Sequence, residues 1–180
     1  PLVTPGDYMV RFRGIESSEL LFQIRRVSSS VELRDRPPPT YLLLQARMRS
    51  DVEKIVAVLR SRGYLSARVS PEIRREEKKE IIIFTIDPGT PFRIGEVTFS
   101  LTVPFLSHRP TFPAPSEIGL KPGTTLNFKT ILRAQSRLID RLRNRGFPFA
   151  RLENRDIVAD HGTATADITF GIDPGPRARF

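Results

Sequence analysis

Leu59-Arg-Ser-Arg-Gly-Tyr-Leu-Ser-Ala-Arg-Val69 returns 83 residues later as Leu142-Arg-Asn-Arg-Gly-Phe-Pro-Phe-Ala-Arg-Leu152. Downstream, Phe84-Thr-Ile-Asp-Pro-Gly89 returns as Phe170-Gly-Ile-Asp-Pro-Gly175, at a spacing of 86 residues. The three additional residues fall between the two motifs, where a hairpin loop can hold them. The chain therefore contains two copies of one module of about 80–85 residues, and repeated modules usually bind rather than catalyse.

The first copy has the pattern of a strand, two helices and two further strands. Alternating polarity predicts a strand at Tyr8–Arg13, and a serine-capped short helix follows at Ser17–Ile24. A longer amphipathic helix is predicted from Tyr41 to Arg62, where a glycine follows. The last two strands, Ser66–Ile73 and Ile81–Ile86, are joined by a hairpin whose residues are all charged.

The second copy repeats this order around a proline-rich insertion. Its first strand, Phe92–Leu101, changes the phase of its alternation at Gly95, as at a β-bulge. Thr102–Pro115 holds four prolines and predicts an irregular insertion, after which a vestigial helix is expected near Ser116–Leu120. The remaining predicted elements are a helix capped by Asn127 and ending near Arg145, and the strands Phe149–Ile157 and Ala164–Ile172.

Proline placement predicts which strands lie at the edge of each sheet. Pro71 has no N–H group to donate to a ladder, so Ser66–Ile73 is expected at an edge. Ile81–Ile86 contains no proline and is almost continuously apolar, which is typical of a strand with neighbours on both sides. The corresponding run Ala164–Ile172 is expected in the centre of the second sheet.

The fold class is therefore α+β, with tandem β-α-α-β-β modules. Each module is expected to have a three-stranded mixed sheet covered on one face by two helices. The predicted boundaries are residues 1–88 for the first module, 89–175 for the second and 176–180 for the start of a truncated third. Pro176–Phe180 occupies the position after Asp-Pro-Gly that Thr90–Ile94 occupies in the second module.

The composition points to an anionic partner. The formal net charge is +9, and the chain contains no cysteine, so disulfides and thiolate metal sites are absent. Such a charge favours nucleic acid, anionic lipid headgroups or an acidic protein, although a solvated arginine-rich surface is the alternative explanation. No stretch is apolar over the 18 residues of a membrane-spanning helix.

The sequence lacks the motifs of catalysis, cofactor binding and metal binding. His108 and His161 fall in predicted loops without a second ligand at metal-binding spacing. Asp87 and Asp173 recur in the two copies, but both precede Pro-Gly, where a role in the turn is sufficient. We therefore expect a non-enzymatic protein without cofactor or metal.

A basic stripe follows the second long helix. Arg133, Arg137, Arg141 and Arg145 are spaced by four residues, so they line one side of about four helical turns. The stripe could bind phosphates or an acidic partner, or it could be the solvated face of an amphipathic helix.

Taken together, these features resemble the POTRA module, the polypeptide-transport-associated domain found in front of outer-membrane β-barrel insertases. The resemblance rests on the element order, on Gly63-Tyr64 and Gly146-Phe147 after the helices, and on the terminal Asp-Pro-Gly. Asp-Pro-Gly-Thr-Pro-Phe-Arg-Ile-Gly-Glu-Val and Ile-Asp-Pro-Gly-Pro-Arg-Ala-Arg-Phe are similar to the TamA type of translocation and assembly module.

The resemblance implies the periplasmic portion of a Gram-negative outer-membrane protein. It implies that the chain binds unfolded outer-membrane proteins, such as autotransporters, and a TamB-like partner anchored in the inner membrane. Binding would occur by addition of an extended strand to a sheet edge. The candidate edge residues are Ser66, Ala67, Arg68, Val69, Ser70, Phe149, Ala150, Arg151, Leu152 and Glu153.

Other functions remain open at this point. A two-partner-secretion transporter and the essential barrel-assembly protein are alternatives within the same superfamily. Nucleic-acid binding is the alternative from a different class, but it rests on charge alone, because no KH-type GxxG loop or aromatic sheet motif accompanies the arginines. No nucleic-acid partner is expected.

Overall fold

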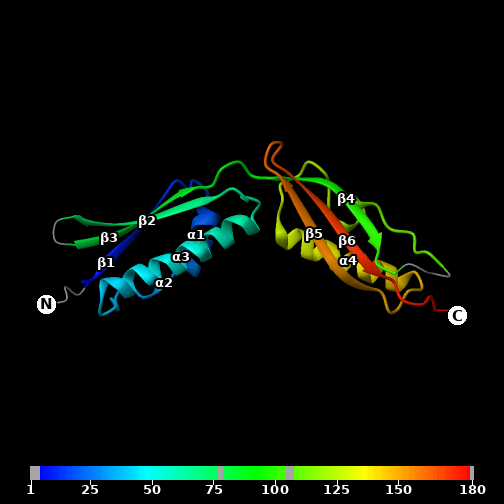
Figure 1. Cartoon of the computed structure of the whole chain (residues 1–180), viewed down its shortest axis with the longest axis horizontal. Helices are drawn as coiled ribbons and strands as arrows, with labels where there is room; N and C mark the ends of the chain where they lie inside the picture. Colours follow the sequence, from blue (N-terminus) through cyan, green and yellow to red (C-terminus); the bar gives the residue numbers. More distant parts are fainter. Residues whose placement is uncertain (1–4, 77–78, 104–107, 179–180) are drawn as a thin grey trace. The chain divides into compact units, whose positions relative to one another are not determined.

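The computed structural model describes residues 5–76, 79–103 and 108–178. The chain folds into two compact units, Pro1–Thr90 and Pro91–Phe180. Each unit has a three-stranded sheet with helix on one of its faces (Figure 1). The α+β class and the tandem arrangement predicted from the repeat are thus confirmed.

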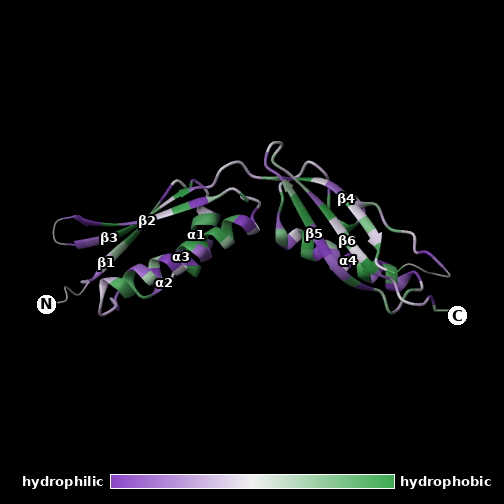
Figure 2. Ribbon diagram, viewed as in Figure 1, coloured by the Kyte–Doolittle hydropathy of each residue, from purple (hydrophilic) through white to green (hydrophobic). Residues whose placement is uncertain are grey.

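The first unit has the predicted strand order. Its elements are β1 (Tyr8–Arg13), α1 (Ser18–Val27), α2 (Ser29–Glu32), α3 (Tyr41–Ser61), β2 (Arg68–Glu76) and β3 (Lys79–Asp87). The sheet has the order β1-β3-β2, with β1 parallel and β2 antiparallel to β3. Pro71 lies in outer strand β2, and the apolar run Ile81–Ile86 lies in central strand β3, as predicted. The hydrophilic hairpin end of β2 and β3 is visible in Figure 2.

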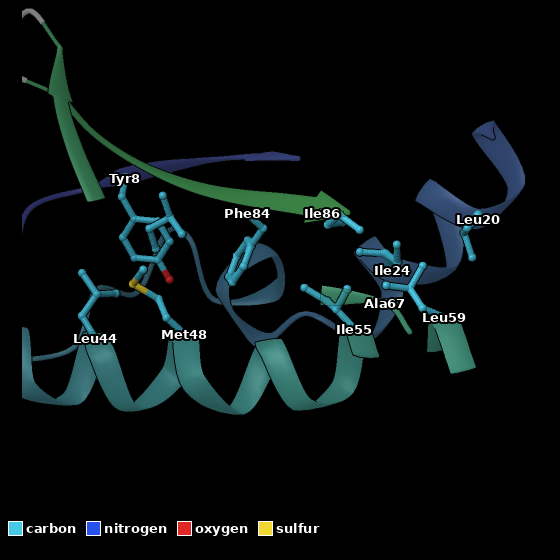
Figure 3. Packing of buried hydrophobic residues seen from close by; sticks show 11 residues of the cluster. Tyr8, Leu20, Ile24, Leu44, Met48, Ile55, Leu59, Ala67, Phe84 and Ile86 are labelled. Carbon is cyan, nitrogen blue, oxygen red and sulfur yellow. The ribbon is translucent and has the colours of Figure 1, made fainter. Parts of the chain in front are cut away.

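The core of the first unit lies between the sheet and the helices. Tyr8, Phe84 and Ile86 extend from the strands toward α3 (Figure 3). The positions that face them on α3 are four or seven residues apart, which places them on one face of a helix with about 3.6 residues per turn. The buried helical residues of this cluster are Leu20, Ile24, Leu44, Met48, Ile55 and Leu59.

A buried carboxylate joins α3 to the short helix α2, which the sequence pattern did not predict. Asp51 is fully buried and accepts hydrogen bonds from the backbone N–H groups of Ser29 and Ser30, both at 2.8 Å. The hydroxyl of Ser28 donates a third bond at 2.8 Å, and the ammonium of Lys54 lies 3.8 Å from the carboxylate. The first N–H groups of a helix have no partner within it, so Asp51 satisfies them from a neighbouring helix.

The second unit repeats the sheet with fewer helical residues. Its elements are β4 (Arg93–Leu101), the 3₁₀ helix η1 (Pro115–Ile118), α4 (Phe128–Asn144), β5 (Arg151–Asp160) and β6 (Thr165–Asp173). The sheet order is β4-β6-β5, so β6 is central as predicted. The register of β4 shifts between Ile94 and Val97, which confirms the bulge expected at Gly95.

The predicted vestigial helix of the second unit is the single turn η1. It occupies the position in the element order that α1 holds in the first unit, and α4 alone supplies the long apolar helical face. Part of the proline-rich insertion, residues 104–107, lies outside the described residues. The predicted third module also stays a prediction: residues 176–178 form no strand, and 179–180 lie outside the described residues.

We predict that Asp51→Asn lowers the free energy of unfolding of the chain by about 1.5–3 kcal/mol, the range for a hydrogen bond to a charged group. An asparagine side chain has one acceptor oxygen and would turn an amide NH₂ toward a backbone N–H. Urea unfolding measures the loss. Glu53→Gln, at an exposed position of the same helix, is the matched control and should leave the value unchanged.

Candidate functional site: the outer strands of the two sheets

The ten predicted edge residues lie at the beginnings of β2 and β5. Ser66–Ala67 and Phe149–Ala150 precede the strands, while Arg68–Ser70 and Arg151–Glu153 are their first residues. Both strands are outermost in their sheets. The two alanines are buried, so their side chains belong to the core and a partner would contact the residues around them.

The β2 edge is interrupted by its proline. Pro71 lies opposite Phe84 in the antiparallel ladder with β3. Because proline has no N–H group, this strand has one backbone donor fewer than its length allows. Glu72 and Arg74 on the same strand form an ion pair at 3.0 Å. Charge and proline are both features by which outer strands avoid pairing with another copy of the protein.

The β5 edge is interrupted by a bulge that the sequence pattern did not predict. Leu152 pairs with Ile172 and Asn154 pairs with Gly171, so Glu153 is the extra residue. A Cβ atom on Gly171 would lie 1.6 Å from the Asn154 side-chain oxygen, so only glycine leaves room for that side chain. Beyond the bulge, the seven residues Asn154–Asp160 pair with β6 without a further shift.

Arg151 is held at the beginning of β5 by two carboxylates. Its guanidinium contacts Glu153 at 2.6 Å and Asp173 at 2.9 Å. The hydrogen bond and charge of Glu153, together with the charge of Asp173, raise the pKa of Arg151 above its ordinary value. The guanidinium, which is charged in proteins in any case, is thus held between two carboxylates at the point where the strand bulges.

A groove runs between β5 and the helix beside it. It is a hollow of about 310 Å³ lined by Gln135, Ser136, Ile139, Asp140 and Arg143 of α4 and by Arg151 and Leu152 of β5. Within this region, the guanidinium of Arg155 donates a hydrogen bond of 2.9 Å to the side-chain oxygen of Gln135, joining strand and helix. The groove is lined mostly by polar and charged side chains, and Ile139 and Leu152 are its apolar residues.

Strands β1 and β4 are also outermost, although sequence reasoning named only β2 and β5. The beginning of β4 is covered by residues that follow the insertion. The N–H of Ile94 donates to the carbonyl of Thr124 at 2.8 Å, and the N–H of Gly123 donates to the carbonyl of Ile94 at 2.7 Å. The N–H of Leu126 bonds the carbonyl of Phe92 at 2.8 Å, so this part of the edge is already paired.

Three arginines of the basic stripe bind the segment that precedes α4. Arg137 donates to the carbonyl of Ile118 at 3.2 Å, and Arg145 donates to the carbonyl of Thr111 at 3.2 Å. Arg141 bonds the carbonyl of Glu117 at 3.2 Å and forms an ion pair with its carboxylate. The fourth, Arg133, is exposed. Much of the stripe therefore holds η1 and the insertion against α4.

The rest of the described chain contains neither a metal-binding cluster nor a membrane-spanning helix. Residues 5–76, 79–103 and 108–178 contain no group of three His, Cys, Asp or Glu side chains that could hold a metal ion. His161 packs edge-to-face on Phe92 at 5.1 Å, and His108 is exposed. Within the same ranges, no helix has the length and apolar character needed to cross a membrane.

A POTRA family model, described as surface antigen variable number repeat, matches residues 24–89 and again residues 115–175. The chain belongs to the POTRA family. Its two matches fall in the two structural units, so each unit is one POTRA module. POTRA modules are non-enzymatic scaffolds, and the match indicates no catalytic family. No curated protein matches the chain.

A solved POTRA structure shows the same fold at low sequence identity, and two further structures are similar with lower scores. POTRA1-3 of the periplasmic domain of Omp85 from Anabaena is 18% identical, with a TM-score of 0.52, over 97% of this POTRA pair and 62% of that chain. BamA POTRA3-5 from Haemophilus influenzae is 16% identical, with a TM-score of 0.48, over 97% of this POTRA pair and 68% of that chain. CdiB from Escherichia coli is 14% identical, with a TM-score of 0.40, over 95% of this POTRA pair and 27% of that chain.

We predict that Gly171→Ala destabilises the second POTRA module by about 1–3 kcal/mol, the range for overpacking a filled site. The added methyl group would overlap the side chain of Asn154, so Gly171→Ala/Asn154→Ala should recover part of the loss. Thermal unfolding measures both. Gly6→Ala, where a Cβ meets nothing within 4 Å, is the control, and an equal loss there would contradict the explanation.

We also predict that Arg141→Gln raises the pKa of Glu117. The N–H of Ala114 donates to this carboxylate at 2.9 Å and Arg141 pairs with it, and both lower its pKa. A lowered pKa means that these bonds stabilise η1 above the ordinary carboxyl pKa, and that this contribution is lost as the pH falls through the folded-state value. Carbon NMR titration of Glu117 measures the shift, and Arg133→Gln should leave it unchanged.

Proposed function

We propose that this POTRA pair is the periplasmic part of an outer-membrane protein insertase of the TamA type. In this role it binds extended segments of unfolded outer-membrane proteins, autotransporters among them, by adding them to a sheet edge. The family membership supports a binding module of outer-membrane assembly or secretion proteins. The TamA type is supported by the Asp-Pro-Gly-containing phrases of the sequence.

The observation that carries the proposal is the regular outer stretch Asn154–Asp160 of β5. These seven residues pair with β6 on one side, and β5 is outermost in its sheet. In an antiparallel strand, alternate residues direct their N–H and C=O groups away from the neighbouring strand. An added strand can bond these groups with little demand on its own sequence. The β2 edge is the weaker candidate, because Pro71 removes a donor.

The groove beside β5 indicates which strands would bind best. Side chains of an added strand would alternate between the α4 side and the opposite face of the sheet. On the α4 side, the part of an added strand that continues past the bulge would meet Ile139 and Leu152, beside the charged groups of Asp140 and Arg143. Strands of outer-membrane barrels alternate apolar and polar residues, so their polar positions can match the mostly polar lining of this groove.

A TamB-like partner anchored in the inner membrane and anionic lipid headgroups are further proposed contacts. The TamA-type resemblance supports the TamB-like partner. The net charge of +9 supports the contact with anionic lipid headgroups. A two-partner-secretion transporter or the essential barrel-assembly protein would use the same edges, and the complete gene would distinguish them by its modules and barrel. Nucleic-acid binding has less support, since the arginines of α4 bind carbonyl groups of the chain itself.

The test is a titration of the ¹⁵N-labelled chain with a ten-residue peptide that alternates valine or phenylalanine with threonine. We expect weak binding, with amide shifts along Asn154–Asp160 and slower hydrogen exchange at alternate β5 amides. Two control peptides carry N-methyl groups at the even or at the odd positions. Only one of them should lose binding, because an added strand bonds the sheet along one of its edges.

Shifts that avoid both β5 and β2, or equal binding by the two methylated peptides, would contradict strand addition. Val158 supplies a control for side-chain effects, because its side chain is 67% exposed on the face of the sheet opposite α4. Val158→Thr should leave the binding constant unchanged if the backbone carries the interaction.

A further inference from the structure

The two POTRA modules differ on the sheet face that lies away from the helices. The repeat aligns Phe84 with Phe170, so Ile81 and Ile83 of β3 correspond to Asp167 and Thr169 of β6. In the second module this central position is polar, and Thr169 bonds Thr98 at 2.9 Å. In the first module it is apolar. The fold itself therefore does not require isoleucine at these two places.

Long side chains of the outer strands cover the two isoleucines. Ile81 is 1% exposed and Ile83 is 0% exposed, yet neither belongs to the core cluster beneath the helices. In the ladders, Met9 and Arg74 flank Ile81, while Arg11 and Glu72 flank Ile83. Long charged side chains can bury their methylene groups on apolar surface and leave their charged ends in water.

Ion pairs form the outer layer of this cover. Arg74 pairs with Glu72 at 3.0 Å, and Arg11 pairs with Glu76 at 3.3 Å. All four side chains are between 39% and 51% exposed, so their charged ends remain accessible. Exposed pairs of this kind contribute little to stability. A partner can therefore exchange them for its own charges at small cost.

An open hollow interrupts the cover near the β2–β3 hairpin. It has a volume of about 630 Å³ and is lined by Met9, Arg11, Glu76, Lys79 and Ile81. Met9 is 42% exposed there, an unbranched side chain that adapts its shape to a partner. Methionine and arginine around an apolar centre are enriched in protein–protein interfaces.

We propose that this face of the first POTRA module, centred on Met9, Ile81 and Ile83, is a docking surface for an amphipathic helix with acidic flanks. The net positive charge of this face favours a partner with negative charge. By strand alternation the face carries the basic residues Arg11, Arg13, Arg68, Arg74 and Lys79 and the acidic residues Glu72, Glu76 and Asp87. The excess is two positive charges, which acidic flanks of a helix would complement.

The geometry of the sheet favours a helix as occupant. The opposite face of the same sheet already packs on α1 and α3 (Figure 1), and a helix on this face would form a second layer over Met9 and the ion-paired side chains that cover Ile81 and Ile83. This surface differs from the strand edges of the proposed function, because it would contact side chains on the face rather than backbone groups at the edge.

The test uses the whole chain and an 18-residue helical peptide with a leucine stripe flanked by glutamates. We expect shifts of the Met9 and Ile81 methyl groups and of the amides around Ile83 in NMR titration. A second peptide carries lysine in place of each glutamate and should bind at least about fivefold more weakly. Amide shifts along β5 report strand addition separately, so the two sites are distinguishable in one experiment.

Matched variants test the face directly. Arg11→Glu should weaken binding of the acidic peptide at least about fivefold, the effect expected for a central interface residue. Thr98→Glu places the same charge at the corresponding position of the second module and should have no effect. Met9→Asp, at a partly exposed position, should abolish the methyl shifts without unfolding the chain.

Other outcomes would overturn the proposal. Equal binding of the two peptides, or shifts confined to β2 and β5 edge amides, would exclude an acidic helix on this face. Binding of phosphatidylglycerol vesicles that Arg11→Glu abolishes, without peptide binding, would assign the face to a lipid surface. Self-association in sedimentation velocity that Met9→Asp abolishes, again without peptide binding, would assign it to a second copy of the chain.

Discussion

Both modules depend on a central strand that has neighbours on its two sides and apolar side chains against a helix. β3 and β6 each pair with one parallel and one antiparallel strand. With only three strands, every sheet has two outermost strands whose backbone groups have a ladder partner on one side alone. A module this small therefore leaves two outer sheet edges as a consequence of how it buries its core.

Three of the outer strands limit pairing in different ways. β2 contains Pro71, β5 contains the bulge at Glu153, and the beginning of β4 is paired with residues 123–126. These features restrict an edge without closing it, because the regular part of β5 continues beyond the bulge. Strand addition, as we propose it, needs this balance, since a fully open edge would pair with other copies of the same chain.

The repeat also shows which features belong to the fold and which belong to one module. The central strands, the glycine after each long helix and the Asp-Pro-Gly turn occur twice. Asp51 and its contacts with α2 occur in the first module, while the arginines that bind η1 occur in the second. Both arrangements hold a short helical segment against the long helix with charge-assisted hydrogen bonds.

The sequence by itself determined the order of the strands and long helices, the central strands and the bulge in β4, because these follow from local periodicity and from residues with special backbone chemistry. Gly95 changed the phase of an alternation and Pro71 excluded a central position, so both were readable along the chain. Asp51 was not, because its partners lie 21 to 23 residues away and only the packing of two helices brings them together. For a similar reason, the sequence pattern did not predict the bulge at Glu153. It depends on the space that Gly171 leaves on the neighbouring strand, and tertiary structure alone decides which glycine faces which side chain.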